Sequence, residues 1–155
     1  MTPAIRAAEK AKIKFAIREY RHDPRAESYG LEAAAALGVS VEHVFKTLVV
    51  KLDMRELVAA LVPVHKNLDL KMLVSVLGVK KVEMADVAEA ERVTGYVTGG
   101  ISPLGQRKRL RTVADVSILQ LDEVFVSAGR RGMDLALYPG DLLRMSEAIT
   151  APIVR

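Results

Sequence analysis

The sequence predicts one compact domain of the α/β class with a mixed sheet. Segments in which apolar residues recur at helical spacing are interleaved with segments of strand character. Several predicted strands follow one another through tight turns, so the sheet should not be purely parallel. The chain has 155 residues, half of them hydrophobic, and no predicted linker or repeat. We therefore treat residues 1–155 as a single domain with a substantial core.

The first predicted helix begins at Thr2, a good N-cap, with Pro3 at the first helical position. Lysines 10, 12 and 14 lie near its expected end, where the helix dipole favours cations. Phe15–Tyr20 then alternates like a half-buried strand. The next expected elements are a loop at 22–24, a helix at 33–37 that ends at Gly38, and a short turn at 40–43 capped by Ser40.

Val44–Val50 is the strongest predicted strand. It is apolar on both faces, which is typical of a central strand covered on each side. After a turn at 53–55, Glu56–Pro63 is expected to return beside it. The segments that follow are a helix at 68–77 with Asn67 or Asp69 as cap and Gly78 as stop, an edge strand at 80–84, and a helix from the cap Asp86 to about Arg92.

The last third of the chain contains a predicted hairpin. Val124–Ala128 and Met133–Tyr138 have strand character, and the turn between them is expected at 129–132. A weaker strand is predicted at 112–114. Asp141 is expected to cap a final helix that reaches about Glu147, and residues 149–154 should be extended.

Composition excludes several kinds of chemistry. The chain has no cysteine, so disulfides, thiolate nucleophiles and cysteine metal sites are ruled out. Its three histidines lie about twenty residues apart, and we predict neither a metal site nor a cofactor. A net charge of +4 permits contact with an anionic polymer. Charges interrupt every apolar run and the first residues lack the apolar core of a signal peptide, so we expect a cytoplasmic protein.

A glycine-rich stretch, Val93–Gln106, is the main candidate for a binding loop. Its four glycines allow close approach of a ligand to the backbone, and Pro103 restricts the shape of the loop. Four cations follow within residues 107–111. Such a loop beside a basic run suits a ligand with phosphates and carbonyl oxygens. A glycine turn followed by a solvated basic face explains the same residues equally well.

Two charged residues lie in predicted strands, and the residues alone favour the ordinary explanation of each. Lys46 shares a strand face with apolar neighbours, but such a lysine commonly extends its ammonium into water. Asp134 is expected to face solvent by simple alternation. Ser127, on the partner strand, has no histidine near it in sequence. Tyr20 and Tyr29 flank the loop at 22–24 and suit either a pocket wall or the core.

The chain resembles the YbaK family, and the resemblance covers nearly its whole length. It rests on five motifs in order: YRHDP at 20–24, FKTL at 45–48, GVKKVEMA at 78–85, TGYVTGGISPLGQ at 94–106 and VSAGRRG at 126–132. This family includes cysteinyl-tRNA(Pro) deacylases and the domains inside some prolyl-tRNA synthetases that remove alanine. The resemblance implies a mixed, partly barrel-like sheet surrounded by helices.

The resemblance also implies a set of site residues. Lys46 would anchor the end of the aminoacyl-tRNA, and the loop Gly99, Gly100 and Ile101 would offer backbone groups to the scissile ester. The pocket positions would be Tyr20, Tyr29, Thr47, Ser127 and Asp134. Tyr29 replaces the usual phenylalanine and Ala128 a usual glycine. Basic residues expected to contact tRNA are Arg107, Lys108, Arg130 and Arg131.

The implied activity is removal of cysteine from mischarged Cys-tRNA(Pro), with the substrate's own thiol attacking its carbonyl. The enzyme then needs no nucleophile or metal and acts by positioning and by stabilising negative charge. The partners implied are tRNA(Pro) and prolyl-tRNA synthetase. Two alternatives remain at this point, an alanyl-tRNA(Pro) deacylase and a non-catalytic module that binds aminoacyl-tRNA.

Overall fold

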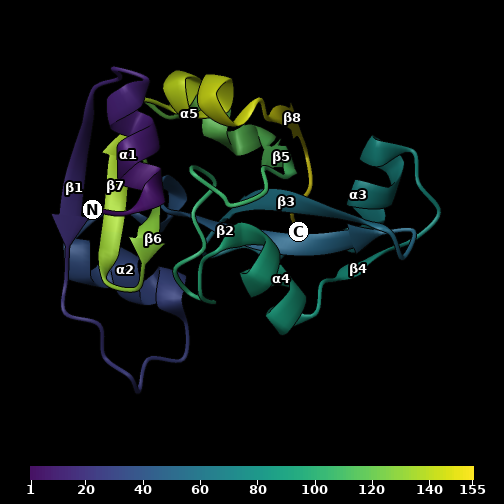
Figure 1. The fold of residues 1–155 in the computed structure, drawn as a ribbon, viewed down its shortest axis with the longest axis horizontal. Helices are drawn as coiled ribbons and strands as arrows, with labels where there is room; N and C mark the ends of the chain where they lie inside the picture. The colour runs from purple at the N-terminus through teal and green to yellow at the C-terminus, as the bar shows by residue number, and fades with distance from the viewer.

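The computed structural model describes residues 1–155 as one mixed α/β domain (Figure 1). Its helices are α1 (Pro3–Lys10), α2 (Tyr29–Leu37), α3 (Leu70–Leu77), α4 (Val87–Thr94) and α5 (Pro139–Ser146), with short 3-10 helices at Val41–His43 and Val116–Gln120. Its strands are β1 (Phe15–Glu19), β2 (Phe45–Leu52), β3 (Glu56–Pro63), β4 (Val82–Met84), β5 (Arg111–Asp115), β6 (Val124–Arg130), β7 (Met133–Leu137) and β8 (Ile149–Ala151).

The strands form two sheets. The larger has the order β4-β2-β3-β5-β8 and is mixed, because β4, β2 and β3 pair antiparallel whereas β3, β5 and β8 pair parallel. The smaller is antiparallel with the order β1-β7-β6. A parallel bridge between Val44 and Phe125 joins them. The predicted mixed sheet and the expected central position of β2 are thus confirmed.

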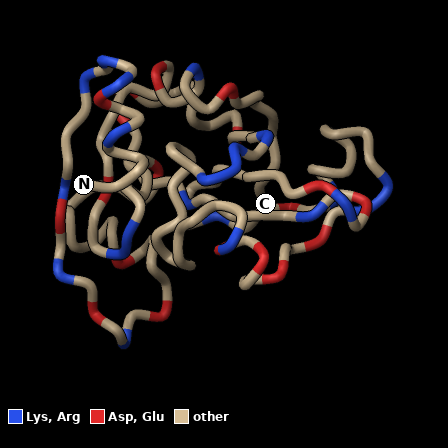
Figure 2. Tube along the Cα trace, viewed as in Figure 1, with Lys and Arg blue, Asp and Glu red and all other residues tan.

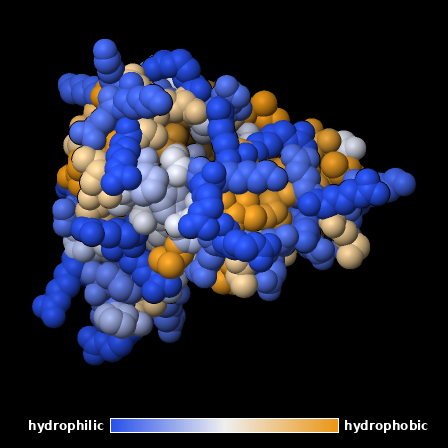
Figure 3. Space-filling view, viewed as in Figure 1, coloured by the Kyte–Doolittle hydropathy of each residue, from blue (hydrophilic) through white to orange (hydrophobic).

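The helices cover the two sheets from opposite ends of the molecule. Figure 1 shows the small sheet with α1 and α2 at one end, and β4 with α3 at the other. One hydrophobic cluster gathers α1, β6 and β7, and another packs α3 against β2 and β3. The outer surface is mainly polar in Figure 3, with a limited apolar area between the two ends. No helix combines the length and apolar character needed to cross a bilayer.

Helix ends follow the capping residues closely. The side chains of Thr2, Asp69 and Asp86 accept hydrogen bonds from first-turn amides of α1, α3 and α4. Gly38 and Gly78 adopt the left-handed conformation, with φ of 69° and 65°, and end α2 and α3. These five positions confirm the boundaries predicted from the sequence.

Three predicted boundaries are wrong at the helices. Helix α1 ends at Lys10, and Lys12 has a φ of 58°, so the lysines at 12 and 14 lie outside it. Helix α2 begins at Tyr29, because Ser28 caps it by accepting from the Leu31 amide. Tyr138, not Asp141, precedes α5, and the Asp141 carboxylate accepts from Arg144 instead.

The late hairpin is also tighter than predicted. Strand β6 continues through Gly129 and Arg130, and only Arg131 and Gly132 form the turn. A register shift between Ser127 and Arg130 marks a bulge. The Ser127 hydroxyl accepts from the Gly129 amide at 3.1 Å within it. The bulge therefore brings the β6–β7 turn toward the glycine-rich loop.

Candidate active site

A cavity of about 340 Å³ has walls from both sheets, α2, α4 and the glycine-rich loop. Thirteen of its 22 lining residues are hydrophobic. Eight of the nine residues predicted as catalytic or substrate-binding line it: Tyr20, Tyr29, Lys46, Thr47, Gly99, Ile101, Ser127 and Asp134. A largely apolar cavity with a few polar groups is typical of a small-molecule site.

Lys46 lies near the start of β2, opposite Val62 of β3. Its side chain is half-buried in the cavity wall, where desolvation alone lowers its pKa. The ammonium makes no hydrogen bond or ion pair within the chain. Lys46 therefore lines the cavity with an ammonium that has no partner within the chain. An ammonium in this position is free to bind a carbonyl oxygen or an anion.

Asp134 is buried, with 6% of its surface exposed, and lines the same cavity. The expectation that it faces solvent is wrong, because β7 is the central strand of its sheet and all five of its residues are buried. Burial raises the pKa of Asp134 to about 6. Its register partner Arg18 donates to the Leu37 carbonyl instead, so no cation within the chain pairs with this carboxylate.

Tyr20 follows β1 and brings its ring to the cavity wall. Its backbone amide donates to the Gly132 carbonyl at 2.9 Å, which fixes the residue beside the β6–β7 turn. Burial, and then the negative charge of Asp134, raise the pKa of Tyr20 to about 12. The phenol therefore stays protonated and can donate a hydrogen bond into the cavity.

Thr47 and Ser127 add two hydroxyl groups. The Thr47 hydroxyl oxygen is the one buried side-chain polar atom in the chain without a hydrogen-bond partner. Leaving such a group unpaired costs about 1–3 kcal/mol, so a ligand that pairs with it gains affinity. Ser127 lies opposite Asp134 in the β6–β7 pairing. No histidine lines the cavity, so a Ser–His–Asp arrangement is absent.

Two backbone amides of the glycine-rich loop have no acceptor within the chain. The amides of Thr98 and Gly100 are engaged, by the Glu91 carboxylate at 2.7 Å and the Val97 carbonyl at 2.8 Å. Those of Gly99 and Ile101, which both line the cavity, donate to nothing within the chain. Gly100 was predicted with them but lies outside the lining. It packs against the Arg130 backbone, where a Cβ would lie 2.8 Å away.

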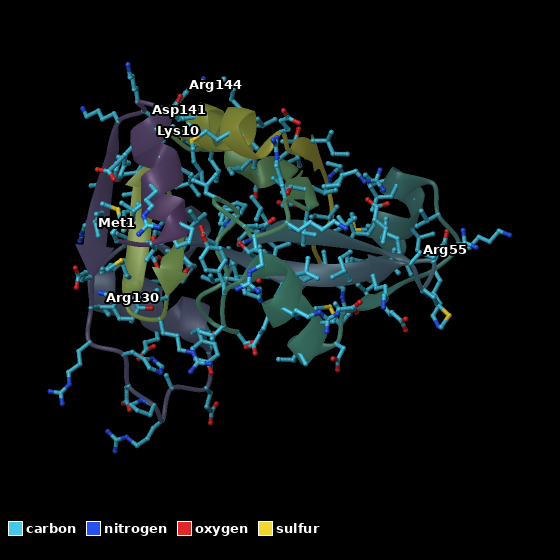
Figure 4. All side chains as sticks on the ribbon, in the orientation of Figure 1. Met1, Lys10, Arg55, Arg130, Asp141 and Arg144 are labelled. Atoms are coloured by element: carbon cyan, nitrogen blue, oxygen red, sulfur yellow. The ribbon has the colours of Figure 1, made fainter.

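Tyr29 and Arg131 form one edge of the cavity mouth. The Arg131 guanidinium lies 4.7 Å from the centroid of the Tyr29 ring, and its Nε donates to the Thr98 carbonyl at 2.8 Å. A Cβ at Gly99 would lie 2.8 Å from the same ring. Loop, aromatic ring and guanidinium are therefore packed as one unit. Figure 4 shows Arg130 close by, at the β6–β7 end near α2.

The four residues predicted to contact tRNA fall into two groups. Arg130 and Arg131 are exposed and pack against Gly100 and Tyr29, respectively, although neither lines the cavity. Arg107 and Lys108 lie beyond it, against the end of α4. Figure 2 shows this second group within a run of basic residues between the glycine-rich loop and β5. The structure thus does not bring all four to one place.

The sequence interpretation missed the wall opposite Tyr29. Met84, Val87 and Ala90 line the cavity from β4 and α4. Met84 ends β4 and Val87 begins α4, and 50% and 57% of their surfaces remain exposed. Met84 belonged to a predicted edge strand, and Val87 and Ala90 to a predicted helix. Neither assignment indicated that these residues line a cavity. No group of three or more histidine, aspartate or glutamate side chains could hold a metal ion.

Three comparisons place the chain among known proteins. The aminoacyl-tRNA editing domain model matches residues 23–145. EbsC of Enterococcus faecalis, described as a candidate Cys-tRNA(Pro)/Cys-tRNA(Cys) deacylase, is 35% identical over 153 residues, covering 98% of this chain and 92% of EbsC. A proline–tRNA ligase of Desulforamulus reducens is 36% identical over 104 residues, covering 67% of this chain and 18% of the ligase.

One solved structure adds to these relatives. A crystal structure described as a candidate trans-editing enzyme for prolyl tRNA synthetase superimposes with a TM-score of 0.84 and 25% sequence identity. The match covers 100% of this chain and 99% of that chain. The same arrangement of helices and two sheets therefore extends over the whole of both chains.

Proposed function

The chain belongs to the aminoacyl-tRNA editing domain family, and from this premise we propose that it is a trans-editing deacylase that removes cysteine from mischarged Cys-tRNA(Pro). Residues 1–155 would form one deacylase domain that needs no cofactor. Aminoacyl-tRNA deacylase is the class of enzyme named for its relatives. We further propose tRNA(Pro) and prolyl-tRNA synthetase as partners, and the cytoplasm as the place of action.

One observation carries this proposal. A single cavity holds an unpaired ammonium, an unpaired carboxylate and two free backbone N–H groups, from Lys46, Asp134, Gly99 and Ile101. An aminoacyl ester carries an α-ammonium on one side of its carbonyl and a ribose with its phosphate on the other. The polar groups of the cavity complement such a molecule in charge and in donor character.

Each polar group then has a role. Asp134 binds the α-ammonium, and its ionised form becomes favourable once that cation is paired with it. Lys46 binds the terminal nucleotide or the ester carbonyl. The amides of Gly99 and Ile101 donate to the carbonyl oxygen as negative charge develops on it. The hydroxyls of Thr47 and Tyr20 orient the aminoacyl group.

The bond changes need no protein nucleophile. The substrate thiol loses its proton, its sulfur bonds to the carbonyl carbon, and the ester C–O bond breaks. The departing 3′ or 2′ ribose oxygen takes up the proton, and water later opens the thioester so formed. Holding sulfur and carbonyl in contact supplies most of the rate enhancement, because the attack is intramolecular.

The largely apolar cavity also fits a second candidate substrate, the alanyl ester of tRNA(Pro). Alanine has no thiol, so its release requires an activated water. Alanine has a hydrogen where cysteine has its thiol, and a difference of this size changes binding in an apolar cavity by only about 1–3 kcal/mol.

Release of label from cysteinyl-, alanyl- and prolyl-tRNA(Pro) tests the proposal, with purified protein and its Lys46→Ala variant. We expect rapid loss of cysteine from wild type and a loss of rate of about 100-fold or more in the variant. Lys51→Ala is the matched control, because Lys51 lies on the same strand and pairs with Glu89 outside the cavity. Loss of alanine alone would show that the substrate is alanyl-tRNA(Pro). Survival of all three esters would refute the proposed deacylase activity.

A further inference from the structure

Three cations gather at the C-terminal end of α4. Arg92 is in the last turn of this helix, and the segment after the glycine-rich loop runs beside it. The Arg107 amide donates to the Thr94 carbonyl at 2.8 Å, and the Lys108 amide to the Val93 carbonyl at 3.0 Å. The Arg107 guanidinium donates to the carbonyl of Arg92 at 3.3 Å. We call Arg92, Arg107 and Lys108 the α4 basic patch.

No carboxylate neutralises this patch. Neighbouring cations are paired, Arg109 with Glu147 at 2.8 Å and Arg111 with Glu56 at 3.1 Å. The nearby acids of α4 are also engaged, since Glu89 binds Lys51 and Glu91 accepts from the Thr98 amide. Arg92, Arg107 and Lys108 form no ion pair and are all exposed. Three positive charges therefore remain available to an external anion.

Helix α4 connects the patch with the cavity. Val87 and Ala90 line the cavity, whereas Val93 and Lys108 line a second groove, of about 290 Å³. An eight-residue helix is about 12 Å long. A nucleotide advances at least about 3.4 Å along a stacked strand, so this span corresponds to no more than about three nucleotides.

We propose that the α4 basic patch binds the phosphates of the RNA strand that leads into the cavity. The proposal rests on the proposed function, because an ester placed in the cavity fixes where that strand begins. Guanidinium groups suit phosphate oxygens through paired N–H donors. The patch thus extends substrate recognition from the aminoacyl group to the nucleotides next to it, without reading their sequence.

The test uses two substrates that share the same ester. One is cysteinyl-tRNA(Pro), and the other is cysteinyl-adenosine, which lacks the strand beyond the terminal nucleoside. The patch variant is Arg92→Gln/Arg107→Gln/Lys108→Gln. The matched control is Lys10→Gln/Lys12→Gln/Lys14→Gln, which removes three exposed charges at the end of α1. Figure 4 shows Lys10 near α5, above Arg130 and away from the β6–β7 turn.

We expect the patch variant to lose about tenfold or more in kcat/KM on the tRNA and to keep its rate on cysteinyl-adenosine. The negative slope of log(kcat/KM) against log[salt] should become shallower by about 2, the value for three single-strand phosphate contacts. The control should match wild type on both substrates. A patch variant equal to wild type on tRNA, or equally impaired on both substrates, would overturn the proposal.

A binding measurement keeps the patch testable apart from catalysis. Uncharged tRNA(Pro) is titrated into wild type and both variants, and the dissociation constant is followed with salt. Weaker binding and a smaller salt slope in the patch variant alone support the proposal. Equal binding of tRNA by wild type and both variants refutes the role of the patch. Failure of wild type to hydrolyse any ester is a separate result, and it refutes the proposed function.

Discussion

The carboxyl group of Asp134 links the proposed binding of substrate to the stability of the fold. Its pKa is about 6 in the folded chain against 3.8 for an ordinary aspartate. The folded state therefore binds more protons than the unfolded state between about pH 4 and 6, and stability falls as the pH rises through this window. Above about pH 6, the ionised carboxylate lowers the free energy of unfolding by about 3 kcal/mol, because a difference of one pKa unit corresponds to about 1.4 kcal/mol.

Asp134→Asn should consequently separate stability from activity. At pH 7 we expect the free energy of unfolding to rise, by up to about 3 kcal/mol, because the buried charge is gone. At pH 4 most of this gain should vanish. Deacylation should fall about 10- to 100-fold, the value of a hydrogen bond to a charged group. Urea unfolding at both pH values and kcat/KM at pH 7 provide the measurements.

The two results together locate the carboxylate in the binding step. A variant that is more stable and less active fits a charge held for the α-ammonium of the substrate. A variant that is less stable at pH 7 would show that Asp134 has an internal partner. Full activity in the more stable variant would remove Asp134 from substrate binding.

Gly99 is a second residue at which geometry and activity are coupled. Its φ is 86°, and a Cβ would lie 2.8 Å from the Tyr29 ring. Gly38 has a φ of 69°, and a Cβ there would have no neighbour within 4 Å, so Gly38→Ala carries the backbone cost alone. Gly38→Ala should lose about 1–2 kcal/mol of stability, and Gly99→Ala should lose more, because the Tyr29 ring must also move. Only Gly99→Ala should also lose deacylation, because displacing Tyr29 moves the Gly99 and Ile101 amides.

Thermal unfolding and label release on the two glycine variants make this comparison. Equal activity in Gly99→Ala and Gly38→Ala would mean that the loop amides do not contact the reacting ester. The comparison is informative because both glycines are in the left-handed region and differ mainly in what surrounds them.

Residue types predicted the site only in part. The strand position of Lys46 was evident, but strand periodicity could not tell whether its ammonium faces water or a cavity. Asp134 was assigned to solvent because alternation assumes one exposed face, and β7 has none. The resemblance to a known family assigned both residues to the pocket, and both line the cavity. It could not reveal that Gly100 uses its amide within the loop.

Helix α1 acts on the site although it contributes no residue to the cavity. The Thr2 hydroxyl donates to the Ala128 carbonyl of β6, and a Cβ at Gly105 would overlap the backbone of Pro3. The Tyr96 hydroxyl donates to the Leu104 carbonyl at 2.6 Å within the same packed region. The start of α1 therefore holds both the glycine-rich loop and β6 in place.

Replacing the hydroxyl of Thr2 should loosen this region. Thr2→Val removes the N-cap bond from the Ile5 amide and the bond to Ala128, and we expect a loss of about 1–2 kcal/mol in stability. Amide hydrogen exchange should accelerate in residues 95–106. Thr2→Ser keeps the hydroxyl and should restore both properties. Unchanged exchange in Thr2→Val would mean that α1 does not hold the loop.

Elements were predicted best where one residue decides the boundary. The caps Thr2, Asp69 and Asp86 act through a single side-chain oxygen, and the sequence displays them directly. The β6–β7 turn was misplaced because its bulge depends on the Ser127 hydroxyl and on packing against Gly100. A boundary set by contacts between distant segments has no local signature.

At the scale of the whole molecule, the cavity exists only because two sheets meet. Val44 and Phe125 form the bridge between them, and the residues around the cavity come from positions 20 to 134. The sequence predicted a mixed sheet correctly but not its division into two. The family match begins at residue 23, yet β1 before it pairs with β7 along the segment that carries Asp134.

On the proposed function, the cavity would recognise what every cysteinyl-tRNA shares, and this would limit its own selectivity. Its polar groups suit the ester, the α-ammonium and the adjoining nucleotide, and the proposed role of the cations around it is to bind phosphates. Discrimination between tRNA bodies would then come from another protein. We expect the isolated chain to deacylate Cys-tRNA(Pro) and Cys-tRNA(Cys) at similar kcat/KM, and added prolyl-tRNA synthetase to favour Cys-tRNA(Pro).

Competition between the two charged tRNAs, with and without prolyl-tRNA synthetase, measures this directly. A second synthetase that does not bind tRNA(Pro) serves as the control for added protein. The physical reason for the expected shift is that a bound synthetase raises the local concentration of one tRNA near the cavity without altering the chemistry. Strong preference for Cys-tRNA(Pro) by the isolated chain would instead require that its own surface reads the tRNA body.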